Sequence, residues 1–304
     1  MTGSIIVSDV VAGALRERRP VVALETTLVT HGLPRPDGLR VAATLESAVR
    51  ENGAIPATIG ILDGRLRIGL SAAELARLAD APGVVKVNPG NMAALIASGG
   101  SGSTTVAATL FAAARAGIRV FATGGIGGVH RGATETGDVS ADLPALARHP
   151  VAVVCAGAKA ILDLPRTVEM LETLGVPVLG AGCDEFPAFY RRSSGLRVDA
   201  RCDGAAALAA AIRAHFDLGL PGGVVVANPI PAADELPAAI HDAALATALA
   251  EAATAGPRGR DVTPFLLERM RVLTGGASLR ANEALLLDNA RLAAEVAVML
   301  ASAA

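Results

Sequence analysis

Aromatic residues are scarce in this chain of 304 residues, which has six Phe, one Tyr and no Trp. Proteins that bind single-stranded nucleic acid stack bases on aromatic side chains, and the net charge of −2 leaves no basic stripe. Nucleic acid is therefore not an expected partner. The chain also lacks an uninterrupted run of about 20 apolar residues, so the sequence predicts no membrane-spanning helix and no membrane partner.

Cysteine is rare as well. Cys155, Cys183 and Cys202 form neither a CxxC pair nor a Cys/His spacing, which argues against a zinc site and against a disulfide framework. The first 20 residues lack the basic-then-apolar order and the small-residue cleavage site of a signal peptide. We therefore expect a cytoplasmic protein.

The scarcity of lysine is the most informative feature of the composition, because Lys86 and Lys159 are the only lysines among 27 Lys and Arg residues. Arg serves equally well in surface ion pairs, but only an amine can lose a proton near neutrality and form a Schiff base with a carbonyl carbon. Both lysines lie at the ends of apolar runs, where burial favours the neutral amine. The pattern indicates carbonyl chemistry. The alternative is that a composition rich in Ala, Gly and Arg retained two lysines at random.

Short apolar runs alternate with amphipathic stretches, which is typical of a layered α/β protein with a largely parallel sheet. Strands are predicted at 21–24, 58–62, 66–70, 84–87, 119–122, 151–155, 176–179 and 224–227. Asp63-Gly64 joins the second and third of these, which predicts a type I′ hairpin. We expect a three-layer α/β/α sandwich with a largely parallel mixed sheet, in a single domain over residues 1–304.

Several helix boundaries are marked by capping signals. Ser71 stands three residues before Glu74 and predicts a capping box. Closer to the C-terminus, Pro264 is expected in the first turn of one helix, and Ser278 is expected to cap a last long helix that ends at about Ala301.

Two glycine-rich stretches are candidate binding loops. Residues 98–106 combine small side chains with free amides before an Ala-rich helix, which is typical of an anion site, although a flexible loop with an ordinary Ser/Thr cap is the alternative. Residues 123–132 follow the predicted strand 119–122, at the strand end where ligands of α/β sheets gather. In this stretch His130 and Arg131 can contact a phosphate or hydroxyls, or His130 can be a loop residue without a task.

Acidic residues occur at two places of interest. Glu25 directly follows the predicted strand 21–24, where a carboxyl group can be held protonated as a general acid or can simply cap a helix or loop. A later turn alternates the oxygen-bearing side chains of Glu135, Asp138, Ser140 and Asp142. Such a turn can hold a hard divalent cation or bind sugar hydroxyls, and a solvated acidic loop is the alternative.

Five strings of residues resemble, in the same order, the pseudouridine-5′-phosphate glycosidase family, which includes proteins named for indigoidine synthase A. They are VALETT at 22–27, KVNPG at 86–90, FATGGIGGVHRG at 121–132, DVSADL at 138–143 and CAGAK at 155–159. The likeness continues through Asn228-Pro229-Ile230-Pro231 and residues 263–267 to Asn289, and so covers nearly the whole chain.

The resemblance implies an indigoidine synthase A-like fold, a homotrimer, and reversible cleavage of the carbon–carbon bond of pseudouridine 5′-phosphate to uracil and ribose 5-phosphate. It also implies one divalent metal ion per subunit, typically Mn²⁺. By resemblance, Lys159 is the covalent nucleophile, Glu25 the proton donor and Asp138 the metal ligand. The positions that match substrate-binding residues are Lys86, the backbone at Val106, Ser140, Ala141 and Asp142, with Thr123, His130 and Asn289 in motifs near the site.

Gly137 is a departure from the family pattern, since relatives usually have a bulky aromatic residue before the metal-binding Asp. We expect this difference to affect the shape of the loop rather than the metal ligand, Asp138, itself.

The carbon attachment of the base explains why an amine is needed. Expulsion of a uracil carbanion is prohibitively difficult, so Glu25 is expected to protonate the ribose ring oxygen and neutral Lys159 to add to C1′, giving an imine-type adduct. Uracil leaves after protonation at C5, and water then releases ribose 5-phosphate. Two other functions remain open: another Schiff-base enzyme acting on phosphosugars, such as an aldolase, and a phosphosugar-binding regulator that has lost catalysis.

Overall fold

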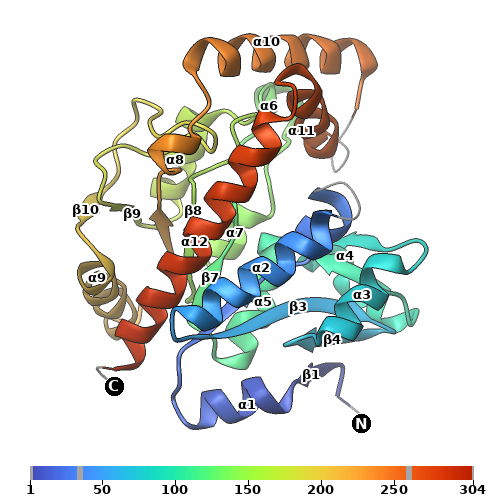
Figure 1. The fold of residues 1–304 in the computed structure, drawn as a ribbon, viewed down its shortest axis with the longest axis vertical. Coiled ribbons are helices and arrows are strands. Elements are labelled where there is room, and N and C mark those ends of the chain that lie inside the picture. The colour runs from blue at the N-terminus through green and yellow to red at the C-terminus, as the bar shows by residue number, and fades with distance from the viewer. Residues whose placement is uncertain (1–2, 33–36, 258–261, 303–304) are drawn as a thin grey trace.

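The structure, a computed structural model, describes residues 3–32, 37–257 and 262–302 and places one large sheet between two layers of helices (Figure 1). The strands are β1 (Ile5–Val7), β2 (Val21–Leu24), β3 (Ile55–Leu62), β4 (Arg65–Ile68), β5 (Val85–Val87), β6 (Gly102–Thr104), β7 (Val120–Ala122), β8 (Ala152–Cys155), β9 (Val178–Ala181), β10 (Ala200–Cys202) and β11 (Val224–Ala227).

The helices are α1 (Asp9–Arg16), α2 (Asp37–Glu51), α3 (Ala72–Asp80), α4 (Pro89–Ala97), α5 (Val106–Ala116), α6 (Ala133–Thr136), α7 (Asp142–Leu146), α8 (Leu164–Thr173), α9 (Ala205–Asp217), α10 (Ala238–Ala255), α11 (Val262–Leu273) and α12 (Ala277–Ala301). A π-helical turn, η1 (Leu28–Gly32), and a 3₁₀ turn, η2 (Ala232–Asp234), complete the described elements.

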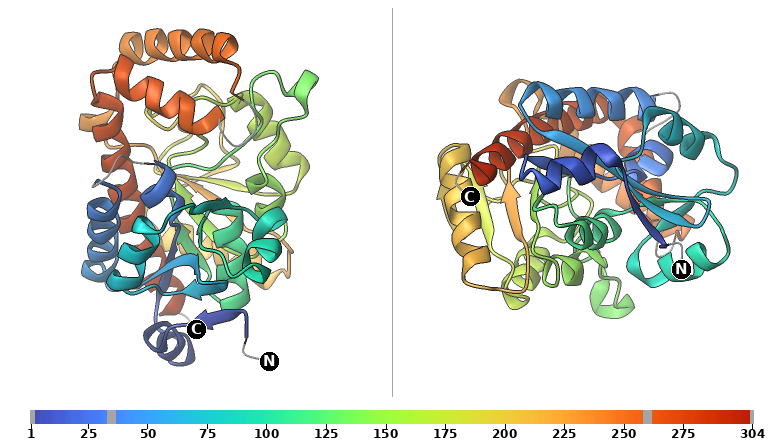
Figure 2. Two further views of the ribbon diagram at one scale, coloured as in Figure 1. Left: turned by 90° about the vertical axis from the view of Figure 1, so that its right-hand side faces the viewer. Right: turned by 90° about the horizontal axis from the view of Figure 1, so that it is seen from below.

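The strand order is β1-β4-β3-β2-β7-β8-β11-β9-β10, with β6 paired to β3 and β5 paired to β6. Within the described parts of the chain, neighbouring strands run parallel except where β3 meets β4 and β6. Helices α2 and α12 cover one face of the sheet, and α5 and α7 lie on the other (Figures 1 and 2). The predicted three-layer α/β/α architecture with a largely parallel mixed sheet is confirmed.

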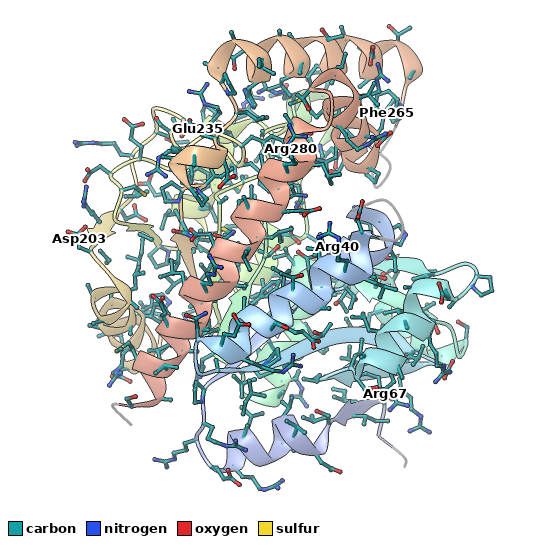
Figure 3. The ribbon with its side chains drawn as sticks, viewed as in Figure 1. Arg40, Arg67, Asp203, Glu235, Phe265 and Arg280 are labelled. Carbon is teal, nitrogen blue, oxygen red and sulfur yellow. The ribbon has the colours of Figure 1, made fainter. Side chains whose placement is uncertain are left out.

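Helix α12 holds the outer layer to the sheet. It packs against α2 and α9 and crosses β2, β7 and β8, and small residues such as Ala290, Ala293 and Ala294 are buried in this contact. Alanine lets the helix axis approach the sheet closely, so few aromatics are needed in the core. At the surface, Arg40 of α2 forms an ion pair with Glu283 of α12 at 2.6 Å (Figure 3).

Each predicted strand corresponds to an observed one, with ends that agree to within a few residues, whereas β1, β6 and β10 were not predicted. Strand β6 lies inside the stretch 98–106, which the sequence suggested to be a loop. Its small residues are required by packing, since a Cβ on Gly102 would lie 2.4 Å from a methyl group of Val87 and 2.6 Å from one of Leu95. In β6, small residues that are otherwise typical of loops allow neighbouring elements to pack closely.

Local turn and cap predictions agree with the structure, with one exception. Asp63 and Gly64 both have positive φ, 52° and 69°, as a type I′ hairpin requires. The Ser71–Glu74 capping box is present at the start of α3. The prediction that Ser278 caps the last helix is wrong.

Helix α12 has Gly276 at its N-cap position, because the left-handed conformations of Gly275 and Gly276 turn the chain directly into the helix. Ser278 is buried in the first turn, where its N–H donates to the hydroxyl of Thr274 at 3.1 Å.

Within the part of the chain that the structure describes, none of the helices is both long and apolar enough to cross a bilayer.

Candidate active site

A cavity of about 580 Å³ opens at the carboxyl ends of the central parallel strands. Glu25 directly follows β2, Thr123 directly follows β7, and Lys159 lies four residues after β8. Because these three strands are adjacent and parallel, their ends meet at one edge of the sheet. The sequence-predicted site residues that line the cavity are Glu25, Lys86, Val106, Thr123, His130, Asp138, Ser140, Ala141, Asp142 and Lys159.

Glu25 lies at the base of the cavity. Its carboxylate accepts a short hydrogen bond from the Thr123 hydroxyl. Burial raises the pKa of Glu25 above its ordinary value of 4.5, and this effect outweighs the positive charges of Lys159 and Lys86 and the hydrogen bond from Thr123, which lower it. Glu25 therefore holds a proton more tightly than an exposed glutamate, as a general acid must.

Lys159 reaches the cavity through a tight turn. Gly157 has a φ of 77°, and a Cβ there would lie 2.0 Å from the carbonyl oxygen of Pro187, so another residue would not fit. The turn directs the Lys159 side chain back toward β7, where Nζ donates to the carbonyl oxygen of Gly125 at 2.8 Å. Glu25 and Lys159 both line this cavity, and the positive charge of Lys159 lowers the pKa of Glu25.

Lys86 enters from β5, on the other side of the cavity. Its backbone is held by the parallel pairing with Ser103 of β6 and by a hydrogen bond from Asn91 Nδ2 to its carbonyl oxygen, at 3.1 Å. The charge of Lys86 contributes to lowering the pKa of both His31 and His130. Both lysines thus share one cavity, although 73 positions separate them in the sequence.

Two histidines line the same cavity, and burial is the main cause that lowers the pKa of each. For His130, the nearby carboxylate of Asp138 opposes this shift, and the charges of Lys159 and Lys86 add to it. Both imidazoles are therefore mainly neutral near neutral pH, when they can donate and accept hydrogen bonds. His31 is a cavity residue that was not predicted.

Asp142 has a structural role in the cavity wall. Its two carboxylate oxygens accept backbone N–H groups, one from Ala107 at 2.9 Å and one from Gly127 at 2.7 Å. The side chain thereby ties the first turn of α5 to the glycine-rich loop. Glycine is required at 127, since a Cβ there would lie 2.2 Å from Ser140 Oγ and 2.7 Å from Asp142 Oδ2.

The first turn of α5 is also the part of the 98–106 stretch that can receive an anion. The Thr105 side chain accepts from the N–H of Ala108, and Asp142 accepts from that of Ala107. Among the described residues, the Val106 N–H has no partner, and Val106 lines the cavity. One backbone donor with the favourable helix dipole is therefore available to a ligand.

Asp138 is the one predicted metal ligand. Its side chain is 33% exposed, lines the cavity, and lies 4.0 Å from Nδ1 of His130. No group of three or more His, Cys, Asp or Glu side chains suitable for a metal occurs in the described chain. The residues thus fit a hard cation that one carboxylate anchors and that water or substrate oxygens otherwise surround, as Mg²⁺-like ions often are.

The loop before Asp138 can accommodate the departure from the family pattern. Gly137 has a φ of 67°, and nothing lies within 4 Å of the position that a Cβ would take. The conformation favours glycine, and the space beside it is open.

Asn289 is the predicted site residue that the structure does not place in the cavity wall. It is 1% exposed and lies behind the wall, where its amide nitrogen donates to the carbonyl of Thr123 at 2.8 Å. Asn282, two turns earlier on α12, lines the cavity instead. Apolar side chains also line the cavity, among them Leu28, Leu162, Phe189, Pro264, Leu267 and Leu286.

The cavity residues Asn282 and Leu286 could not be identified from local motifs. Together with Asn289 they follow the spacing i, i+4, i+7, so the sequence places all three on one helical face. It did not show that this face crosses the end of β7.

Comparison with known proteins identifies the family. Residues 10–299 match the family model described as indigoidine synthase A like protein, so the chain belongs to this family. A protein of Rhodospirillum centenum that is 61% identical over 95% of this chain and 90% of its own length is named pseudouridine-5′-phosphate glycosidase. A protein of Caldanaerobacter subterraneus with the same name is 52% identical over 99% of this chain and 98% of its own.

Solved structures agree with this assignment. The prealnumycin C-glycosynthase AlnA in complex with ribulose 5-phosphate is 42% identical and superposes with a TM-score of 0.91, covering 98% of this chain and 97% of its own. An indigoidine synthase A-like protein from Thermotoga maritima is 36% identical with a TM-score of 0.89, covering 99% of this chain and 98% of its own.

Proposed function

We propose that this protein is a pseudouridine-5′-phosphate glycosidase, which reversibly cleaves the carbon–carbon glycosidic bond of its substrate to give uracil and ribose 5-phosphate. The observation that carries the proposal is that Glu25, whose pKa is raised by burial, and the amine of Lys159 line one cavity. The relatives named for this activity, at 52% and 61% identity over nearly the whole chain, support it.

Glu25 supplies the first proton. The substrate's ring oxygen accepts it, the bond from that oxygen to C1′ breaks, and the ring opens as neutral Lys159 forms a bond to C1′. The hydrogen bond to Gly125 O holds the Lys159 nitrogen in place. The adduct is an amine bonded to C1′, and its nitrogen gives up a proton to the Glu25 carboxylate. Once C5 is protonated, the electron pair of the C1′–C5 bond returns to the uracil ring as uracil leaves, and the nitrogen lone pair forms an iminium with C1′. Water then hydrolyses the iminium and frees ribose 5-phosphate.

Different lining residues suit different parts of the substrate. Lys86 and the free Val106 N–H provide positive potential for the phosphate or sugar oxygens. The apolar side chains of the cavity suit the flat faces of a pyrimidine, and the Asn282 amide can hydrogen-bond its edge. Ser140, Ala141 and His130 also line the cavity and are available to the sugar.

We further propose that Asp138 holds one Mn²⁺ ion per subunit. A bound divalent ion would supply positive charge to substrate oxygens. The test is Asp138→Ala with and without added Mn²⁺. Turnover by the unaltered protein should fall on chelation and return with Mn²⁺, whereas the variant should not respond. Equal responses in both proteins would contradict the assignment.

The direct test of function is incubation with pseudouridine 5′-phosphate, with and without Mn²⁺, followed by product analysis. Release of uracil together with ribose 5-phosphate is expected. If the phosphosugar is cleaved within its carbon chain, the protein is instead an aldolase. If ribose 5-phosphate binds but neither forms a borohydride-trapped adduct on Lys159 nor combines with uracil, it is a binding regulator.

The whole-molecule expectations also remain proposals. We propose that the chain is a single domain, that it acts as a homotrimer in the cytoplasm, and that it binds small molecules rather than nucleic acid. Light scattering coupled to size exclusion would measure the mass of the assembly against the 30.5 kDa chain.

A further inference from the structure

A chain of buried amides lies directly behind the cavity wall. Asn228 is the first residue after β11 and Asn289 lies in the middle of α12, and neither lines the cavity. Asn228 Nδ2 donates to Asn289 Oδ1 at 3.0 Å and to Asp288 Oδ2 at 2.8 Å. Asn289 Nδ2 in turn donates to the carbonyl oxygens of Thr123 at 2.8 Å and Gly124 at 3.4 Å.

The hydrogen-bond pattern determines which way both amides face. An ionised carboxylate only accepts hydrogen bonds, so Asp288 requires the nitrogen of Asn228. The same nitrogen is the donor to Asn289, which must therefore present its oxygen to Asn228 and its nitrogen to the carbonyls. Reversal of either amide would leave buried polar groups unpaired, which is unfavourable.

The carbonyls that Asn289 holds belong to the turn that serves both reacting groups. Thr123 donates its hydroxyl to Glu25, and Gly125 accepts the hydrogen bond from Lys159 Nζ. A displacement of the turn would therefore move the partner of the proton donor and the partner of the nucleophile together.

We propose that Asn289 and Asn228 are positioning residues, which hold the Thr123–Gly125 turn so that Glu25 and Lys159 are aligned for reaction. Neither touches the substrate. The inference rests on the proposed glycosidase function. The positioning role replaces the expectation, based on motif resemblance, that Asn289 binds substrate. It also assigns a role to Asn228, the first residue of the motif Asn228-Pro229-Ile230-Pro231.

The principal test compares Asn289→Leu with a matched control. Leucine has nearly the shape of asparagine and adds no charge, but it leaves the Thr123 carbonyl without its donor. The control is Asn52→Leu, since Asn52 makes the same kind of bond, from Nδ2 to the Ala48 carbonyl at 2.8 Å, near the end of α2. We expect kcat of Asn289→Leu to fall by about 10- to 100-fold with KM changed less than about twofold. The control should keep both constants.

The pH dependence separates positioning from a general loss of stability. The hydrogen bond from the Thr123 hydroxyl lowers the pKa of Glu25. Asn289→Leu should displace the Thr123–Gly125 turn and weaken this bond. The basic limb of the pH–kcat profile should then move to higher pH. Thr123→Val should cause the same movement, and the double variant should move no further than Thr123→Val alone. An unchanged profile with a raised KM would overturn the proposal, as would an unchanged kcat.

A second variant and a second measurement test the proposal further. If Asn289→Leu does not fold, the milder variant Asn228→Ser is compared with the control by the same criteria. The titration of Glu25, followed by carbon-13 NMR without substrate and assigned with Glu25→Gln, requires no turnover. If the unaltered protein does not release uracil, the proposed function fails, whereas an unmoved Glu25 titration in the asparagine variants overturns the positioning role by itself.

Discussion

At the scale of single residues, two lysines in the same cavity are expected to do different work. In the proposed mechanism Lys159 attacks as a neutral amine, whereas Lys86 acts through its charge on the groups around it. Arg can replace a charge but cannot become a neutral nucleophile. The two scarce lysines lie in one cavity, and they differ in their neighbours there.

Lys159→Arg should retain the fold and lose turnover by at least about 1,000-fold, because the variant has no amine to form the adduct. The matched variant Lys86→Arg keeps a positive charge and should weaken substrate binding while retaining the adduct. Borohydride trapping with ribose 5-phosphate, read by mass spectrometry, measures this difference. Substantial turnover by Lys159→Arg would reject the covalent role.

Glu25 is a second residue whose role can be measured in two independent ways. Its pKa is raised in the folded protein, so the native state binds this proton more tightly than the unfolded chain. The stability due to the proton is fully present below the ordinary pKa of 4.5 and is lost as the pH rises through the folded value.

Glu25→Gln removes the ionisation but keeps the shape. The variant should gain stability relative to the unaltered protein at pH 8, and the gain should disappear towards about pH 4. Turnover should fall by about 100-fold or more, because the proton donor is lost. Denaturant unfolding at several pH values measures the stability difference. A difference that does not change with pH would show that Glu25 titrates normally.

At the scale of elements, the glycine-rich loop 123–132 depends on close contacts that only the fold creates. Gly127 lies against Ser140 and Asp142, and Gly125 lies against Phe189, where a Cβ would come within 2.6 Å of the ring. The sequence predicted this loop to be a binding element from its place after a strand, and several of its residues line the cavity. Which glycines are obligatory depends on elements that are distant in the chain, and so could not be predicted.

Gly127→Ala should destabilise the protein by about 1–3 kcal/mol, because the new methyl group overlaps Ser140 Oγ and forces the loop from α5. Gly13→Ala is the control. It lies within α1, where the nearest atom to a new Cβ, on Arg16, is 3.8 Å away, and alanine is the better helix former. Thermal unfolding compares the two. Equal stability of both variants would show that the loop adjusts without strain.

At the scale of the whole molecule, the fold collects groups from distant parts of the chain into one cavity. Ligand binding at such a site stabilises all the elements that line it, because the unfolded chain has no site. Ribose 5-phosphate at 100 times its dissociation constant should add about 2.7 kcal/mol to the free energy of unfolding.

The dependence on phosphate makes this prediction specific. Ribose without phosphate, at the same concentration, should raise the melting temperature much less, and Lys86→Gln should reduce the effect of ribose 5-phosphate. Differential scanning fluorimetry is sufficient to measure these shifts. Equal stabilisation by ribose and ribose 5-phosphate would contradict an anion site at Lys86 and the first turn of α5.

Sequence by itself determined eight of the eleven described strands, the Asp63-Gly64 hairpin and the Ser71 cap, because these depend on neighbours within a few positions. It also supplied the candidate residue types for the proposed chemistry. Only the tertiary structure decided that the Asp142 carboxylate accepts hydrogen bonds from two backbone N–H groups and that Asn282 rather than Asn289 faces the cavity. The same holds for Ser278, which does not cap α12. Hydrogen bonding and burial at these positions depend on partners up to 166 residues away, and local spacing contains no information about such distances.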